Sequence, residues 1–204
     1  MWRDCWHWPP LRPQIRPKRP GRAIIRPYDG RVNMTSRRVL DPMRIPMTWV
    51  MSRLPPGRPG SLTERMMRKW SAANIWIYRR TGGRVAGHIG NADLLILRHV
   101  GRRTGAEYAH PLLYIPDGDN LVIAASLGGA TKDPVWYGNL KAAGSGLVEI
   151  GRRRVRVTAR KALPDEAARL WPQLDRAYPP FVRYRDRAQG HREIPPIILT
   201  PVPN

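Results

Sequence analysis

The sequence predicts an α+β fold that is mainly β, in which an antiparallel barrel carries inserted helices. Three observations lead to this prediction: short apolar runs separated by turn sequences, one strictly alternating strand, and helical periodicity confined to a few segments. The strand-like runs follow one another as meanders, an order more typical of an antiparallel barrel than of a doubly wound sheet. A chain of 204 residues is long enough for one domain with a single core.

Residues 1–60 are expected to form a basic, Pro/Arg-rich N-terminal extension, and residues 61–204 the folded domain. The extension holds 13 of the 36 Lys and Arg residues and 11 of the 22 prolines, and its first 42 residues show neither a helical nor a strand period. Disorder is one interpretation, and a mis-assigned translation start, with the true one at Met34 or Met43, is another. Residues 43–60 fit either a peripheral membrane contact or packing beneath the domain.

The first predicted helix follows this extension. Ser61 and Glu64 fit a capping box, and Gly82-Gly83 ends the helix. Apolar residues recur at helical spacing between Glu64 and Gly82, and this stripe is more typical of a core-facing helix than of a cofactor site. These residues are Met66, Met67, Trp70, Ala73, Ile77 and Tyr78.

The strands come next along the chain. Runs at 94–100, 107–115 and 121–126 are separated by the turn sequences GRRTGAE and DGDN, and 196–202 forms a last strand. A further hairpin pairs 147–151 with 153–162, where Val155, Val157 and Ala159 alternate with Arg and Thr. Helices are expected at 134–143 and 164–177, and Pro172 should kink or break the second of them.

Several classes of chemistry are disfavoured by the sequence. Cys5 is the only cysteine, and the five histidines lack metal-ligand spacing, so no metal site is predicted. Ser126 lies in AASLG rather than a G-x-S-x-G elbow, and no G-x-G-x-x-G follows a strand. A bound cofactor is therefore expected to carry the chemistry. The chain shows no run of 18 apolar residues and no secretory signal peptide, which favours a cytoplasmic location.

Three motifs stand out as candidate ligand contacts. The turn GRRTG at 101–105 combines two arginines with glycine-rich backbone and suits an anion, although it is also an ordinary hairpin loop. The segment GGATKDPVWYGNLKAAG at 128–144 joins a flexible hinge to a helix start that Asp133 could cap. Its neighbouring aromatics, Trp136 and Tyr137, diverge by about 100° on a helix. One of them should therefore pack inward while the other lines a cleft. The alternative is that both belong to the core. The third motif is the aromatic segment YPPFVRY at 178–184, which suits either a pocket lid or a satellite hydrophobic cluster.

The order of these motifs resembles the deazaflavin-dependent nitroreductase family. The matching pieces are GRRTG, HPLLY, DGDNLVIAAS-x-GGA-x-K-x-P-x-WY-x-NL, and the distal segments Trp-Pro, Tyr-Pro and Arg-Glu-Ile-Pro. The resemblance as a whole runs from about residue 66 to residue 202. The resemblance implies a split β-barrel of the FMN-binding-like type with an N-terminal helix. It implies an actinobacterial reductase that transfers a hydride from reduced coenzyme F420 to an electron-poor acceptor such as a quinone, enone or nitroaromatic. A monomer or a dimer is expected, with no specific nucleic-acid partner.

The resemblance also implies roles for individual residues. Ser126, Tyr178 and Tyr184 are the candidate catalytic residues, and Leu113 and Phe181 are expected at the substrate pocket. The residues implied to bind the cofactor are Arg102, Arg103, Thr104, Gly105, Pro111, Ala125, Ser126, Leu127, Gly128, Gly129, Lys132, Val135, Trp136, Tyr137 and Asn139. Members that reduce bicyclic nitroimidazoles have tyrosines where this chain has Leu113 and Phe181. We therefore expect weak or absent nitroimidazole reduction, with quinone or enone reduction retained.

Two alternatives stay open at this point. One is a flavoprotein that binds FMN on the same barrel. The other is a basic module that binds nucleic acid or a membrane surface, which the formal net charge of +21 permits. The strand at 153–162 lacks the interleaved aromatics that base stacking would need, and a polyanionic F420 tail accounts better for the arginines.

Overall fold

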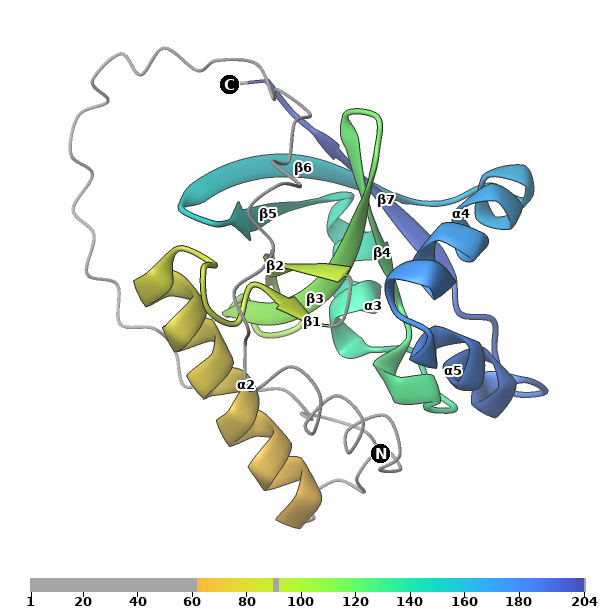
Figure 1. Cartoon of the computed structure of the whole chain (residues 1–204), viewed down its shortest axis with the longest axis horizontal. Coiled ribbons are helices and arrows are strands. Elements are labelled where there is room, and N and C mark those ends of the chain that lie inside the picture. The colour runs from red at the N-terminus through yellow and green to blue at the C-terminus, as the bar shows by residue number, and fades with distance from the viewer. Residues whose placement is uncertain (1–61, 90–91, 204) are drawn as a thin grey trace.

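The computed structural model describes residues 62–89 and 92–203. The proposed capping box at Ser61, the boundary of the extension and the membrane-contact hypothesis for 43–60 lie outside these residues. In the described part, four α-helices accompany one antiparallel sheet that closes on itself (Figure 1). This arrangement confirms the predicted α+β, mainly β, split barrel.

Six strands form the barrel, in the order β2–β3–β4–β7–β6–β5 and back to β2. Their bounds are β2 Ala92–Val100, β3 Glu107–Asp117, β4 Asn120–Ala124, β5 Ser145–Ile150, β6 Arg153–Lys161 and β7 Pro196–Pro201. Every pairing is antiparallel, and the short strand β1 (His88–Ile89) extends the sheet beside β2. The predicted third strand was two residues too long, because β4 ends at Ala124.

The barrel interior is the main core. Side chains that alternate along the strands point inward, among them Leu95 and Leu97 of β2, Ile123 of β4 and Leu199 of β7, all 0% exposed. The helix α3 (Val135–Ala143) inserts Trp136 and Leu140 into the same cluster.

Two further clusters cover the outer faces of the strands. The helix α2 (Leu62–Thr81) packs Ile75 and Tyr78 against the outward side chains of β2. The helices α4 (Pro164–Ala177) and α5 (Pro180–Ala188) lie side by side and cover β4 and β7 on another face (Figure 1). Helices therefore cover the barrel on the sides where its outward-facing side chains are apolar.

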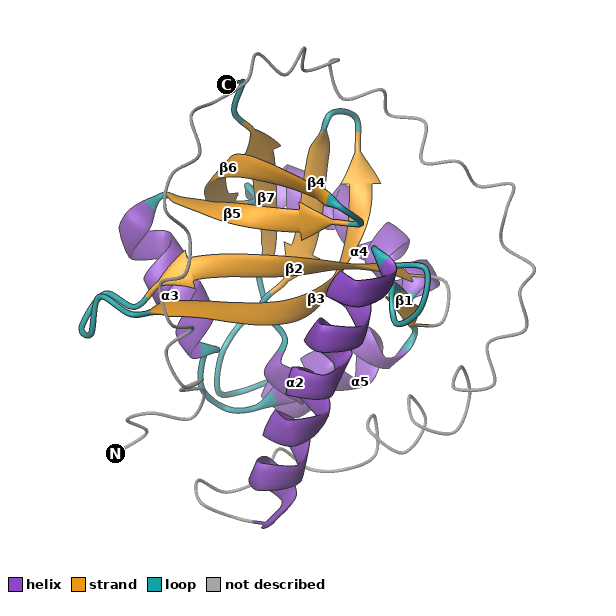
Figure 2. Ribbon diagram, turned by 90° about the vertical axis from the view of Figure 1, so that its left-hand side faces the viewer, coloured by secondary structure: helices purple, strands orange, loops and turns teal. Residues whose placement is uncertain are grey.

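The structure corrects part of the predicted inward stripe of the first helix. Tyr78 is buried as expected, but Met66 is 63% exposed and Ala73 is exposed. Among the described side chains of α2, the buried ones are Ser71, Asn74, Ile75 and Tyr78, which lie on one face at a spacing of three and four residues. Figure 2 shows that the lower part of α2 projects past the edge of the sheet. The predicted end is correct, because Gly82 and Gly83 adopt φ values of +62° and +79° directly after Thr81.

Two segments near the C-terminus add to what the sequence predicted. Helix α4 continues through Pro172 without the break that was one of its two expected effects. The helix α5, which the sequence did not predict, begins at Pro180 within the motif at 178–184, and Pro180 lies in its first turn.

Candidate functional site

The turn after β2 has the tight geometry that its sequence predicts. The amide of Gly105 donates to the Gly101 carbonyl (2.8 Å), and the amide of Gly101 donates to the Ala106 carbonyl (2.8 Å). A methyl group on Gly101 would lie 2.6 Å from the Tyr108 ring, so glycine is required there. Arg102, Arg103, Thr104 and Gly105 are exposed on this turn.

The structure brings this turn onto α3. A methyl group on Gly138 would lie 2.3 Å from Nη1 of Arg102, which places that guanidinium across the helix. The amide of Arg102 also donates to Oδ1 of Asn139 at 3.4 Å, a long contact. Arg102 and Asn139 are 37 residues apart in the sequence, so two separate motifs form one surface here.

A column of stacked rings lies behind the turn, and sequence reasoning missed it. The rings of His99 and His110 are parallel within 4° at 5.1 Å, and His99 also stacks on Tyr108 at 5.6 Å. Nδ2 of Asn139 lies 3.4 Å from Nδ1 of His99. The stack follows from the register of the β2–β3 hairpin, which pairs His99 with Tyr108 and Leu97 with His110. A correct register for this hairpin would have been needed to predict it.

Burial keeps these imidazoles neutral. It lowers the pKa of His110 to about 3, with a smaller contribution from His99, and it also lowers the pKa of His99. Nε2 of His99 is buried and has no hydrogen-bond partner within the described chain. The stack therefore presents uncharged rings next to a positively charged turn.

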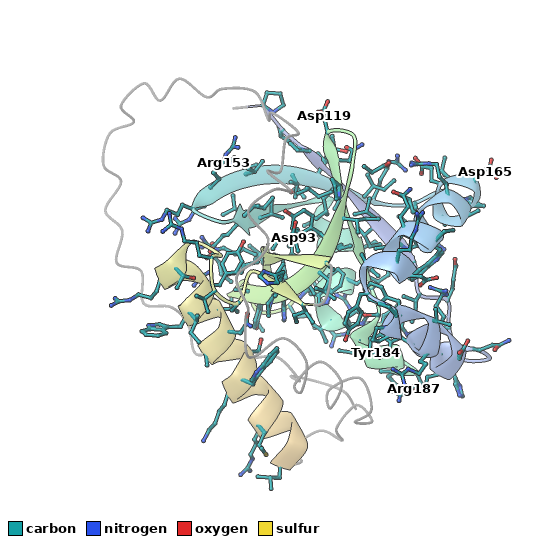
Figure 3. All side chains as sticks on the ribbon, in the orientation of Figure 1. Asp93, Asp119, Arg153, Asp165, Tyr184 and Arg187 are labelled. Atoms are coloured by element: carbon teal, nitrogen blue, oxygen red, sulfur yellow. The ribbon has the colours of Figure 1, made fainter. Side chains whose placement is uncertain are left out.

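The loop after β4 is backbone-strained. Leu127, Gly128 and Gly129 have φ values of +43°, +63° and +80°, and they form the 3₁₀ turn η1 (Leu127–Gly129). A methyl group on Gly128 would meet open space, whereas one on Gly129 would lie 2.6 Å from the Tyr184 carbonyl of α5. The loop thus packs on α5 at one glycine and is open at the other, and Figure 3 shows Tyr184 and Arg187 where α5 meets this turn.

The start of α3 differs from the prediction. Its N-cap is Pro134, which has no side-chain cap hydrogen bond, and Asp133 instead accepts a hydrogen bond from Nη1 of Arg192 (3.1 Å). Asp133 therefore stands one residue before the N-cap position, where the sequence had placed it as the cap. Trp136 is 5% exposed and Tyr137 is half-buried, so one aromatic packs inward as expected. Their rings meet edge to face at 6.1 Å, and burial raises the pKa of Tyr137.

The aromatic motif at 178–184 is a packed cluster in this structure. Phe181 is 4% exposed and meets Tyr178 (5.1 Å) and Tyr184 (6.2 Å) edge to face. The two tyrosine hydroxyls lie 3.3 Å apart, and burial raises the pKa of Tyr178. Leu113 of β3 is half-buried and borders the larger hydrophobic cluster that includes Phe181.

The remaining predicted residues fall around the loop and α3. Ser126 and Leu127 are half-buried, Ala125 is part of the barrel core, and Lys132 and Val135 are exposed. Pro111 is half-buried in β3 opposite Ile96. Which of these side chains contact a cofactor or an acceptor stays a prediction. Within residues 62–89 and 92–203, no three His, Cys, Asp or Glu side chains cluster as a metal site would require, and no helix is long and apolar enough to cross a membrane.

Comparison with known proteins gives a consistent result. The family model described as F420H(2)-dependent quinone reductase matches residues 70–201. A chain of Mycobacterium tuberculosis with the provisional name F420H(2)-dependent quinone reductase Rv3178 is 41% identical over 52% of this chain and 88% of its own. The F420H(2)-dependent quinone reductase Rv1261c of the same organism is 37% identical over 61% of this chain and 85% of its own. A solved structure described as a domain-swapped dimer is 26% identical over 64% of this chain and 97% of its own, with a TM-score of 0.50.

Proposed function

Because this chain belongs to the F420H(2)-dependent quinone reductase family, we propose that it transfers a hydride from reduced coenzyme F420 to a quinone. The match over 70–201 is the observation that carries this proposal, since it spans the whole barrel and the three motifs. The FMN-binding and nucleic-acid-binding alternatives have no comparable support.

The residues around the open loop fit such a cofactor. F420 is polyanionic at one end, where a phosphate and an oligoglutamate tail are joined, and flat at the other. The exposed guanidiniums of Arg102 and Arg103 supply positive charge beside α3, whose N-terminal end carries a partial positive charge. Gly128 leaves the backbone open to close approach, because a methyl group there would meet nothing within 4 Å.

The arginine turn and the glycine loop would then contact different parts of the cofactor. Arg102 and Arg103 would hold phosphate or carboxylate through paired N–H groups. Gly128 and its neighbours would border the flat ring, while the buried Trp136 anchors the helix that follows the loop. When bound, the reduced deazaflavin supplies two electrons together as a hydride from C5. The protein contributes orientation and exclusion of water.

The proton that accompanies the hydride has few candidate sources. The Ser126 hydroxyl lies on the half-buried part of the loop, and solvent is the other source. Tyr178 is a weaker candidate, because burial raises its pKa and its hydroxyl faces that of Tyr184. We therefore assign Tyr178 and Tyr184 to shaping the acceptor side, with Leu113 and Phe181.

A cofactor titration tests this proposal with a matched control. The double variant Arg102→Gln/Arg103→Gln should weaken F420 binding by about tenfold or more, since each lost charge-assisted contact is worth roughly that factor. The control Arg153→Gln/Arg154→Gln removes the same charge from the exposed start of β6 and should leave the affinity nearly unchanged. Tight FMN binding without F420 binding would overturn the proposal, and salt-sensitive binding of duplex DNA alone would favour the basic module.

The acceptor range and the assembly are further parts of this proposal. Quinone and enone turnover with weak nitroimidazole turnover is expected from Leu113 and Phe181. A cytoplasmic monomer or dimer is proposed, with peripheral membrane contact through 43–60. Sedimentation without vesicles measures the oligomeric state, and co-sedimentation with anionic vesicles measures the membrane contact. A protein that stays in the supernatant with the vesicles would argue against the membrane contact.

A further inference from the structure

Arg192 lies between α5 and β7, far along the chain from the loop at 125–133. Its side chain is only 9% exposed, although arginine is rarely buried. The guanidinium is directed at backbone carbonyls of that loop. Nε donates to Ala130 (2.8 Å), Nη1 to Ala125 (3.0 Å) and Nη2 to Ser126 (2.8 Å).

These acceptors stand on both sides of the strained turn η1. Ala125 and Ser126 precede it, Ala130 follows it, and Nη1 also reaches Oδ1 of Asp133 (3.1 Å) and the carbonyl of Glu193 (3.3 Å). One planar group thus joins the entry of the loop to its exit, and the distances of its three best bonds are those of ordinary strong hydrogen bonds.

The loop needs such an external restraint. Its turn places three consecutive residues at positive φ, and Leu127 is one of them, although a side chain disfavours that conformation. Strained backbone persists where the surroundings hold it in place. Within the turn, the amides of Gly129 and Ala130 donate to Ser126 (2.9 Å) and Leu127 (3.1 Å), and the Arg192 contacts flank these two bonds.

We propose that Arg192 is a positioning residue that fixes the loop 125–133 in the conformation that receives the cofactor. The inference rests on the proposed function for its consequence on binding, but its effect on the loop is independent of any ligand. Lysine cannot take over the role, because a single ammonium offers its donors from one point, whereas the guanidinium fork reaches three carbonyls at once.

Hydrogen exchange and cofactor titration test this inference together. In Arg192→Ala and Arg192→Lys, the amides of Gly129 and Ala130 should exchange at least about tenfold faster, as expected when charge-assisted bonds are lost. The F420 dissociation constant should rise by a similar factor. Added millimolar guanidinium should restore part of both in the alanine variant but not in the lysine variant.

Arg185→Ala provides the matched control. Arg185 pairs with Asp175 through two bonds of 2.7 Å and stacks over Trp171 at 4.0 Å, away from the loop. Its removal should lower the melting temperature while exchange in the loop and F420 affinity stay within about twofold of wild type.

Two outcomes would overturn the inference. One is unchanged exchange at Gly129 and Ala130 in both Arg192 variants. The other is an equal change in Arg185→Ala, which would indicate general loss of stability. If the wild-type protein binds no F420 but the loop exchange responds as predicted, the proposed function fails while the positioning role stands.

Discussion

Gly128 and Gly129 are neighbours in one turn, yet an added methyl group would meet different surroundings at each. Both residues have positive φ, +63° and +80°. At Gly128 the methyl group would enter open space, whereas at Gly129 it would lie 2.6 Å from the Tyr184 carbonyl and 2.9 Å from Cβ of Arg187. Alanine substitutions at the two positions should therefore separate cofactor binding from stability.

The expected magnitudes follow from these contacts. Both variants carry the cost of a side chain at positive φ, about 1–2 kcal/mol. Gly129→Ala adds overpacking against the α5 backbone, which cannot move aside cheaply, at about 1–3 kcal/mol. For a protein of this size each kcal/mol lowers the melting temperature by about 2–4 °C, so Gly129→Ala should melt roughly 2–12 °C below Gly128→Ala.

Thermal unfolding and an F420 titration of both variants measure the separation. Gly128→Ala should be the more stable variant but should bind F420 more weakly than wild type, since its methyl group occupies the open side of the loop. Equal melting temperatures would refute the packing argument. Wild-type F420 affinity in Gly128→Ala would refute the assignment of this loop to the cofactor.

Three further predictions concern the core, the histidine stack and the acceptor side. Glu149→Gln should lower the free energy of unfolding by about 3 kcal/mol, the lower end for breaking a buried pair, because Arg79 donates to Glu149 at 2.8 and 2.9 Å but is itself 32% exposed. His110 has a pKa of about 3 in the fold against an ordinary 6.5, so the unfolded chain takes up its proton first as the pH falls. Wild-type stability should therefore decline below pH 6.5 by up to about 1.4 kcal/mol per pH unit from this group, and His110→Gln should lack that slope. Phe181→Tyr should raise nitroimidazole turnover and cost about 1–3 kcal/mol of stability if the new hydroxyl finds no partner.

Each of these has a control and a contradicting result. Arg98 pairs both with the buried carboxylate of Glu149 and with the exposed carboxylate of Glu107, so Glu107→Gln is the control for Glu149→Gln. Chemical denaturation should show that Glu107→Gln lowers the free energy of unfolding by less than about 1 kcal/mol. Equal losses at both glutamates would contradict the argument from burial. Parallel pH–stability curves for wild type and His110→Gln would disprove the buried neutral imidazole. Steady-state assays with nitroimidazole and quinone acceptors that show no change in their ratio would count against Phe181 at the acceptor side.

Local sequence signals predicted most of the scaffold. The alternation of Val155, Val157 and Ala159 identified β6, and the glycines at 82–83 marked the end of α2. Both signals are short-range and depend on backbone geometry alone. The family resemblance, also carried by contiguous residues, was confirmed by the match over 70–201.

Long-range contacts account for what the sequence did not reveal. Asp133 was expected to cap α3 but pairs with Arg192, a residue 59 positions away. Met66 was expected inside but is 63% exposed in the first half of α2. The stack of His99 on His110 depends on strand register, and the bond from Arg192 to Ala125 depends on tertiary folding. Periodicity cannot encode these pairings, because neither partner is distinctive in its own segment.

The most direct test of the account is the anaerobic reaction of reduced F420 with a water-soluble quinone in the presence of the purified protein. The account predicts oxidation of F420 at a rate proportional to enzyme concentration, with one quinol formed for each cofactor oxidised. Oxidation of reduced F420 no faster than in the enzyme-free mixture would contradict it.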